Sequence, residues 1–232
     1  MITAVVVLPC PPALLPGATG ATRVPEVERL RTSCLTALRP LTDDRIDRIL
    51  VIGAGRPGEG SDAKGSVVPA GRRLTPWPER ESEPLPMALA VGAALLAEAG
   101  LAGPRFCGVY EDSAAEVCRQ VGGALAEWDG RTALVVMADG SARRSATAPG
   151  YLDERAVSYD AEIQRAVTEG DTAALAALDP DLATQLWAGG RAAWQVLAGA
   201  LQADGRHWRG EFLYSDDPFG VWYGVARLAP TG

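Results

Sequence analysis

The sequence predicts an α/β fold of three layers, in which a mostly parallel sheet carries helices on both faces. Apolar runs rich in β-branched residues occupy residues 2–8, 48–52 and 132–138, and such continuous runs are typical of strands covered on both faces. Segments with the helical spacing of apolar residues separate these runs. Strands that alternate with helices favour parallel pairing through helical crossovers.

The remaining elements follow in chain order. Further strands are expected at residues 105–110, 212–214 and 221–228. Helices are expected at residues 24–38, 86–99, 113–127, 153–168, 172–177, 180–187 and 190–203. Ser113 is expected to cap its helix, and residues 56–82, with a short strand near Val67, are expected to form a mobile cover over the strand ends.

Size and charge narrow the classes of partner. The chain has 232 residues, 47% of them hydrophobic, and a net charge of −7, so we expect one domain over residues 1–232. No Lys/Arg-rich run favours nucleic acid or an anionic membrane as a partner, and no apolar run is long enough to span a bilayer. We therefore expect a cytoplasmic protein with a small-molecule ligand, and we leave open whether it forms a homo-oligomer.

The four cysteines do not predict a structural zinc site. They are Cys10, Cys34, Cys107 and Cys118, and none forms a C-x-x-C pair. Cys34, Cys107 and Cys118 lie in apolar periodic segments, which indicates small buried thiols.

Polar residues or glycines follow four of the predicted strands. They are Cys10, Gly55, Glu111 and Asp139. If those strands are parallel, these residues lie at one edge of the sheet, where ligands of open α/β sheets bind. We expect them to border one cleft together with the turn at 216–217, with Cys10 and Asp139 as the candidate catalytic residues and Gly55 at the ligand. Ordinary loop chemistry after each strand is the alternative.

The loop after the fourth strand offers a second set of candidates. Asp139 is followed by Gly140, Ser141, Ala142, Arg143 and Arg144. Ser141 and Arg143 are expected to contact a ligand, because Arg143 or Arg144 suits an anion or a carboxylate. A solvated turn is the alternative.

Two further motifs carry less weight. Gly53, Gly55 and Gly58 spell G-x-G-x-x-G after a strand, but no helical pattern follows to point its amides at a pyrophosphate. We therefore expect no dinucleotide there. The single histidine, His207, lies in a polar turn, and without it no Ser-His-Asp or Cys-His arrangement can be built.

Six segments spread over nearly the whole chain occur in a specific order. They are residues 8–12 (LPCPP), 51–55 (VIGAG), 138–144 (ADGSARR), 148–153 (APGYLD), 190–194 (GRAAW) and 218–221 (PFGV). Together they resemble the B-subunit-like family of class III extradiol ring-cleavage dioxygenases, particularly a compact actinobacterial branch. The resemblance implies that family's three-layer fold.

The resemblance also implies a catalytic iron that this chain is not equipped to hold. Catalytic members hold Fe(II) with two histidines and a glutamate, and a further histidine acts in acid–base chemistry. The corresponding places here are Cys10, the neighbourhood of Gly55, the 139–141 segment and, for the carboxylate, Asp216 or Asp217. One histidine cannot supply a two-histidine site, and His207 occupies neither ligand place.

We therefore expect a non-dioxygenase member that binds a small ligand or has a regulatory role, as the related Memo-like proteins keep the fold without known ring cleavage. The alternative is an oxidoreductase or hydrolase that uses Cys10 with Asp139 or Asp217. No cofactor and no metal ligands are predicted, although a thiolate with carboxylates would suit a non-iron divalent metal such as zinc.

The purified protein should not cleave catechols with Fe(II), because the imidazoles that hold iron are missing at both expected places. Oxygen uptake with protocatechuate and simple catechols after anaerobic Fe(II) loading tests this. Turnover that a Cys10→Ala change abolishes would instead identify Cys10 as a substituted ligand.

Overall fold

A six-stranded mixed sheet organises the chain. The computed structural model describes residues 1–20, 22–43, 45–55 and 85–231. The strands are β1 (Ile2–Leu8), β2 (Arg48–Ala54), β3 (Arg105–Val109), β4 (Thr132–Met137), β5 (Trp208–Asp216) and β6 (Tyr223–Pro230). Their order across the sheet is β3-β2-β4-β1-β6-β5. The first four strands are parallel, whereas β6 runs antiparallel to both β1 and β5.

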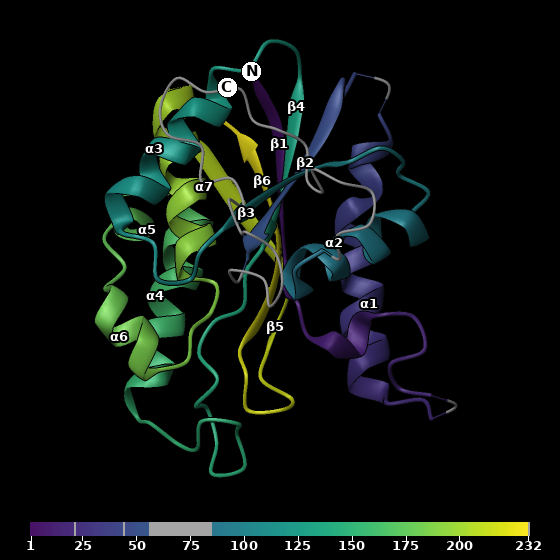
Figure 1. The fold of residues 1–232 in the computed structure, drawn as a ribbon, viewed down its shortest axis with the longest axis vertical. Coiled ribbons are helices and arrows are strands. Elements are labelled where there is room, and N and C mark those ends of the chain that lie inside the picture. Colours follow the sequence, from purple (N-terminus) through teal and green to yellow (C-terminus); the bar gives the residue numbers. More distant parts are fainter. Residues whose placement is uncertain (21, 44, 56–84, 232) are drawn as a thin grey trace.

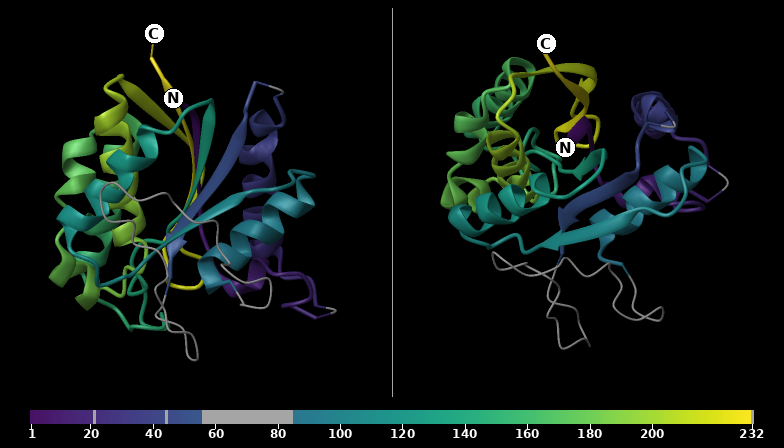
Figure 2. Two further views of the ribbon diagram at one scale, coloured as in Figure 1. Left: turned by 45° about the horizontal axis from the view of Figure 1, so that its top comes forward. Right: turned by 90° about the horizontal axis from the view of Figure 1, so that it is seen from above.

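Helices cover both faces of this sheet, which confirms the three-layer α/β fold (Figure 1, Figure 2). One face carries α1 (Pro25–Leu38) and α2 (Met87–Glu98). The other carries α3 (Ala115–Ala126), α4 (Arg155–Glu169), α5 (Thr172–Ala176), α6 (Pro180–Gln185) and α7 (Arg191–Asp204). Short 3-10 turns lie at Pro12–Leu14 and Arg39–Thr42.

The strand side chains alternate between two hydrophobic cores, as the period of a strand requires. Val5 and Val7 pack on the side of α3 and α7, whereas Val6 and Leu8 pack on the side of α1 and α2. The predicted thiols at Cys34, Cys107 and Cys118 are free and buried. In the described part of the chain, no helix has the length and apolar character needed to cross a bilayer.

Two local expectations were wrong. Ser113 does not cap α3, because the helix begins after Ala114 and has no side-chain cap. The strand expected at 212–214 extends over Trp208–Asp216. This strand lies at the edge of the sheet, and its exposed Arg209 and Glu211 interrupt the apolar pattern. The short strand and cover expected within residues 56–82 lie outside the described residues.

The parallel strands all end at the same side of the sheet, here called the strand-end edge. Both chain termini lie at the opposite side (Figure 1). The loop after β4 and the turn between β5 and β6 extend along the strand-end edge, since β6 starts where its antiparallel neighbour β1 ends.

Helices α3 and α7 touch through their backbones. A Cβ added at Gly122 of α3 would overlap the carbonyl oxygen of Val196 in α7, and one at Gly199 of α7 would overlap the carbonyl oxygen of Arg119. Gly123, the next residue of α3, has nothing closer to an added Cβ than the Ala203 side chain at 4.0 Å.

These two adjacent glycines form a matched pair. Gly122→Ala should lower the free energy of unfolding by about 1–3 kcal/mol, because the new methyl meets backbone that cannot yield. Gly123→Ala should leave it unchanged or raise it by up to about 1 kcal/mol, because alanine favours the helix. Urea denaturation of both variants measures this, and equal effects would show that the close crossing of α3 and α7 is not rigid.

Candidate functional site

The pairing of β1 with β4 brings Cys10 and Asp139 together. Leu8 is in register with Met137, and the amide of Ala138 donates to the carbonyl of Leu8 at 2.9 Å. Cys10 follows Leu8 by two residues, and Asp139 follows Met137 by two residues. The residues that follow the two strands therefore meet at the strand-end edge, as the sequence predicted.

Cys10 and Asp139 make two direct hydrogen bonds. The backbone N–H of Cys10 donates to Oδ1 of Asp139 at 2.8 Å, and the thiol donates to Oδ2 at 3.3 Å. We call these two residues the thiol–carboxylate pair. Both carboxylate oxygens of Asp139 thus accept a hydrogen bond from Cys10, which holds the side chain in one orientation.

Burial changes the titration of both groups. It raises the pKa of Asp139 to about 6, although the hydrogen bonds from Cys10 oppose this shift. Burial also raises the pKa of the Cys10 thiol well above its ordinary value, and the negative charges of Asp139 and Glu111 add to that effect. At neutral pH the pair is therefore a protonated thiol beside an ionised carboxylate, and the thiol is a weak nucleophile.

Gly55 lies at the same edge, at the end of β2. Its N–H donates to the carbonyl of Val109 at 2.8 Å, which continues the pairing of β2 with β3. An added Cβ would come within 3.6 Å of the Gly108 backbone and 3.7 Å of Pro86. Gly55 is thus part of the edge but belongs to the junction of β2, β3 and α2.

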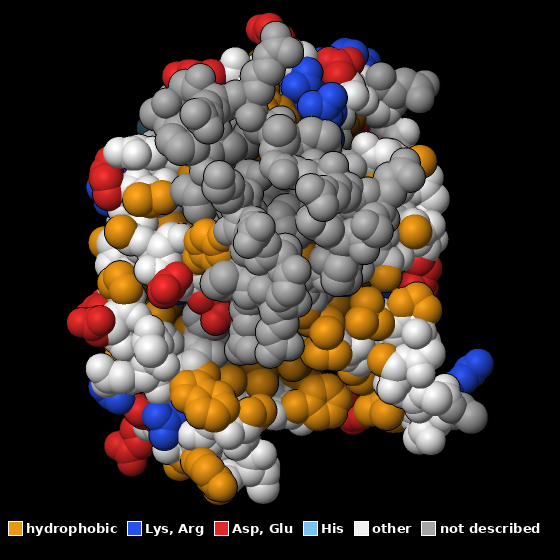
Figure 3. All heavy atoms as spheres, viewed as in Figure 1, with side chains coloured by type: hydrophobic (Ala, Val, Ile, Leu, Met, Phe, Trp, Pro, Cys, Tyr) orange, Lys and Arg blue, Asp and Glu red, His pale blue; other side chains and the backbone are white. Residues whose placement is uncertain are grey.

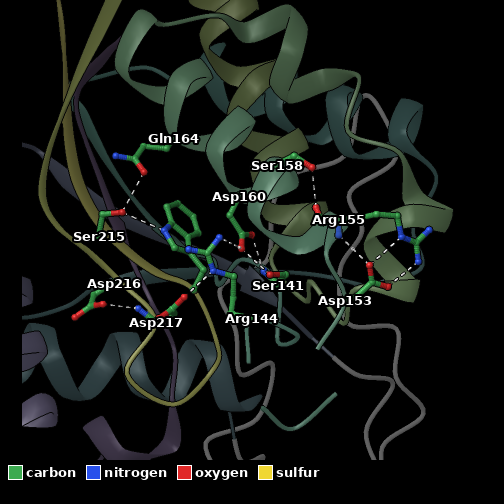
Figure 4. A network of polar contacts seen from close by, with 11 residues as sticks. Ser141, Arg144, Asp153, Arg155, Ser158, Asp160, Gln164, Ser215, Asp216 and Asp217 are labelled. Carbon is green, nitrogen blue, oxygen red and sulfur yellow. Dashed lines mark hydrogen bonds and ion pairs between the residues drawn. The ribbon is translucent and has the colours of Figure 1, made fainter. Parts of the chain in front are cut away.

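A second polar cluster holds the loop after β4 in place (Figure 4). The N–H and the hydroxyl of Ser141 donate to Asp160 of α4 at 2.8 and 2.6 Å. Arg144 lies between two carboxylates, 3.8 Å from Asp160 and 2.7 Å from Asp217. We call these four residues the Asp160 network.

The Asp160 network bears on two predictions from the sequence, one about Ser141 and one about the turn at 216–217. Ser141 is fully buried, so its hydroxyl anchors the loop to α4 and is not presented to a ligand. The Asp216–Asp217 turn does lie at the strand-end edge, but Asp217 pairs with Arg144 and not with Cys10. Burial raises the pKa of Asp160 to about 6, against the opposing effects of Ser141 and Arg144.

The polar contacts of Arg143 are with Gln185 and Asp153, and none is with the thiol–carboxylate pair. Its Nη1 donates to the carbonyl of Gln185 at 2.8 Å and lies 3.8 Å from Asp153. The contacts of Arg143 thus join the loop after β4 to α6. Of the residues expected at the ligand, Cys10 and Asp139 are brought together, whereas Ser141 and Arg143 serve the loop that carries Asp139.

Sequence reasoning missed Asp160 and Trp187. Asp160 occupies an inward position of α4, one turn before the buried Ile163, and an acid on an apolar helix face could have been noticed as a buried polar residue. Trp187 has a left-handed φ of 55° and is 59% exposed. The local sequence does not predict this conformation, because non-glycine residues rarely adopt a left-handed φ.

The donors at the strand-end edge do not fit the iron site that the family resemblance implies. Cys10 and Asp139 are a thiol and one carboxylate, and the place expected for the second histidine is Gly55. His207 lies at the opposite edge, where its carbonyl accepts a hydrogen bond from the amide of Thr231, just after the end of β6. Within the described ranges no group of three or more His, Cys, Asp or Glu side chains could hold a metal ion.

The glycine motif is only partly described. Gly53 belongs to β2, where an added Cβ would come within 3.1 Å of Ala88 and Leu89 of α2, so this glycine allows α2 to pack closely. Residues 56–58 lie outside the described residues, and the expectation that no dinucleotide binds there stays a prediction.

Comparison with known proteins supports the fold. No protein-family model matches the sequence, and no curated protein matches it. The chain is similar in structure to the uncharacterized protein JW3007 from Escherichia coli K12, with a TM-score of 0.59 and 14% identity over 98% of this chain and 99% of that chain. At this identity the similarity shows a common fold, and no function is inferred from it.

The thiol of Cys10 should react slowly with an alkylating agent. At pH 8 its rate with iodoacetamide should be about tenfold or more below that of a free cysteine, because its raised pKa leaves little thiolate. Peptide mapping by mass spectrometry distinguishes Cys10 from the three buried cysteines.

Asp139→Asn should accelerate the alkylation of Cys10, because it removes a negative charge beside the thiol. Asp129→Asn, at the exposed start of the loop before β4, is the matched control and should change nothing. A Cys10 that reacts faster than a free thiol would mean that the pair is an activated nucleophile.

Proposed function

We propose that this chain is a non-dioxygenase member of the class III extradiol dioxygenase-like fold that binds a small molecule at its strand-end edge. The ordered segments from LPCPP to PFGV support the family part of this proposal. The thiol–carboxylate pair supports the binding part. It sets a half-buried carboxylate where open α/β sheets bind their ligands.

The observation that carries the proposal is the combination of two direct Cys10–Asp139 hydrogen bonds with burial that raises the pKa of Asp139 to about 6. Keeping a carboxylate in such a place opposes folding, and perturbed groups of this kind cluster at functional sites. Cys10 orients the carboxylate without neutralising it. Asp139 is therefore suited to accept a hydrogen bond or a positive charge from a ligand at neutral pH.

The second candidate is an enzyme that uses Asp139 as a general acid or base. A carboxyl group that titrates near 6 can exchange a proton close to neutral pH. The same site argues against Cys10 as the nucleophile, because its thiol holds its proton. A zinc enzyme is disfavoured by the donor set, since the pair supplies two ligands where catalytic zinc sites use three from the protein.

A ligand screen tests the binding function. Small molecules of mixed charge are screened by ligand-detected NMR at pH 7.5, and hits are measured by calorimetry. We expect Asp139→Asn to lower the affinity of the hits by about tenfold, which corresponds to the loss of one charge-assisted hydrogen bond. The control Asp129→Asn should leave their affinity unchanged. Their affinity should fall as the pH drops below about 6, because protonation removes the negative charge of Asp139.

The outcomes separate the two candidates. Hits that are chemically converted by the wild type but not by Asp139→Asn would favour the enzyme. Hits that Asp139→Asn leaves unaffected, or a screen without hits, would contradict a ligand site at the thiol–carboxylate pair.

A further inference from the structure

A cavity of about 460 Å³ opens between α6 and the segment after β3. Trp187, Gly189, Arg191 and Glu111 contribute to its walls. Its volume falls in the range of small-molecule sites. Neither Cys10 nor Asp139 lines the cavity, but the backbone of Asp139 lies near it: an added Cβ at Gly190, next to the lining Gly189, would overlap the Asp139 carbonyl.

Trp187 lines this cavity. It is one of two non-glycine residues with a positive φ in the described part of the chain, and its side chain is 59% exposed. A left-handed tryptophan costs roughly 1–3 kcal/mol, so the surrounding turn must impose it. That turn is held by hydrogen bonds from Trp187 to Thr184 and from Ala188 to Ala183. Hydrophobic side chains gather at the lower border of the face drawn in Figure 3, at the end of the molecule opposite the two termini.

Glu111 brings a negative charge to the same cavity. Its Oε1 would lie 3.7 Å from a Cβ at Gly189, so the carboxylate extends across that glycine. Among the described residues, the Glu111 side chain has no hydrogen-bond or ion-pair partner. Its negative charge also contributes to the raised pKa of the Cys10 thiol.

The cation on the cavity wall is already engaged. Arg191 is 4% exposed, and its guanidinium donates to the carbonyls of Glu111 and Ser113 and to Oε1 of Gln195. These acceptors are neutral, so the guanidinium keeps its positive charge, but it is buried and three of its five N–H groups already bond to the protein. The exposed groups of the wall are therefore the Trp187 indole and the Glu111 carboxylate, whereas the Arg191 guanidinium is buried.

We propose that the ligand of the strand-end edge is an organic cation, an amine or quaternary ammonium that stacks on Trp187 and faces Glu111. The indole of tryptophan is the aromatic side chain that attracts cations most strongly, and Glu111 adds direct charge attraction. The net charge of −7 favours the approach of such a ligand. This inference rests on the proposed small-molecule function and names the class of ligand.

Calorimetry with benzyltrimethylammonium tests the inference, with benzyl alcohol and benzenesulfonate as the neutral and anionic counterparts. The cation should bind at least about tenfold more tightly than either counterpart, which corresponds to one cation–π contact with charge assistance. Glu111→Gln and Trp187→Ala should each weaken it by about tenfold, and Trp187→Phe should weaken it less. Glu111 is exposed and Trp187→Phe keeps an aromatic ring, so Glu111→Gln and Trp187→Phe should both fold. Their binding can therefore be measured even if Trp187→Ala does not fold.

Two matched controls define specificity. Glu211→Gln removes an exposed carboxylate from β5, and Phe219→Ala removes an exposed ring from the β5–β6 turn; neither residue lines the cavity. Both should leave binding unchanged. Equal binding of the three probes, no binding of the cation, or no effect of Glu111→Gln would overturn the inference. If only neutral or anionic molecules bind and Asp139→Asn weakens them, the proposed function stands and the ligand class is wrong.

Discussion

The parallel pairing of β1 with β4 is the constraint on which the site depends. These two strands lie in the middle of the sheet, and their register places Leu8 beside Met137. Residues that are 129 positions apart in the chain thereby come within hydrogen-bonding distance. A slip of one residue in this register would turn every side chain of β1 to the other core, so packing of the two cores and geometry of the thiol–carboxylate pair are specified together.

Hydrogen bonds from three directions hold the loop that carries Asp139. Gly140 donates to the carbonyl of Trp222 and Trp222 donates to that of Ser141, while Asp160 binds Ser141 from α4. An added Cβ at Gly140 would come within 2.5 Å of Asp160 and closer to Trp222. The buried carboxylate of Asp160 is tolerated because it accepts two hydrogen bonds and lies near Arg144.

The sequence was sufficient for the architecture because the signals for it are local. Buried strands appear as β-branched runs, and glycines such as Gly170, with its φ of 69°, end helices. Strand-end geometry was also sufficient to pair Cys10 with Asp139. It could not show that Arg143 turns toward Gln185, that Arg144 pairs with Asp217, or that Trp187 faces a cavity with Glu111. Those contacts join segments whose relative placement depends on tertiary packing, which leaves no periodic trace in the chain.

The close crossing of α3 and α7 has a mechanical consequence. Their backbones meet at Gly122 and Gly199, so at this point no side chain lies between the two helices to change rotamer and absorb a displacement. The first turn of α7 carries Arg191, which donates hydrogen bonds to two carbonyls of the segment after β3. Gly190, directly before it, packs against the backbone of Asp139. A substitution that moves α3 away from α7 at this crossing would therefore act on the helix whose first turn contacts both the segment after β3 and, through Gly190, the backbone of Asp139.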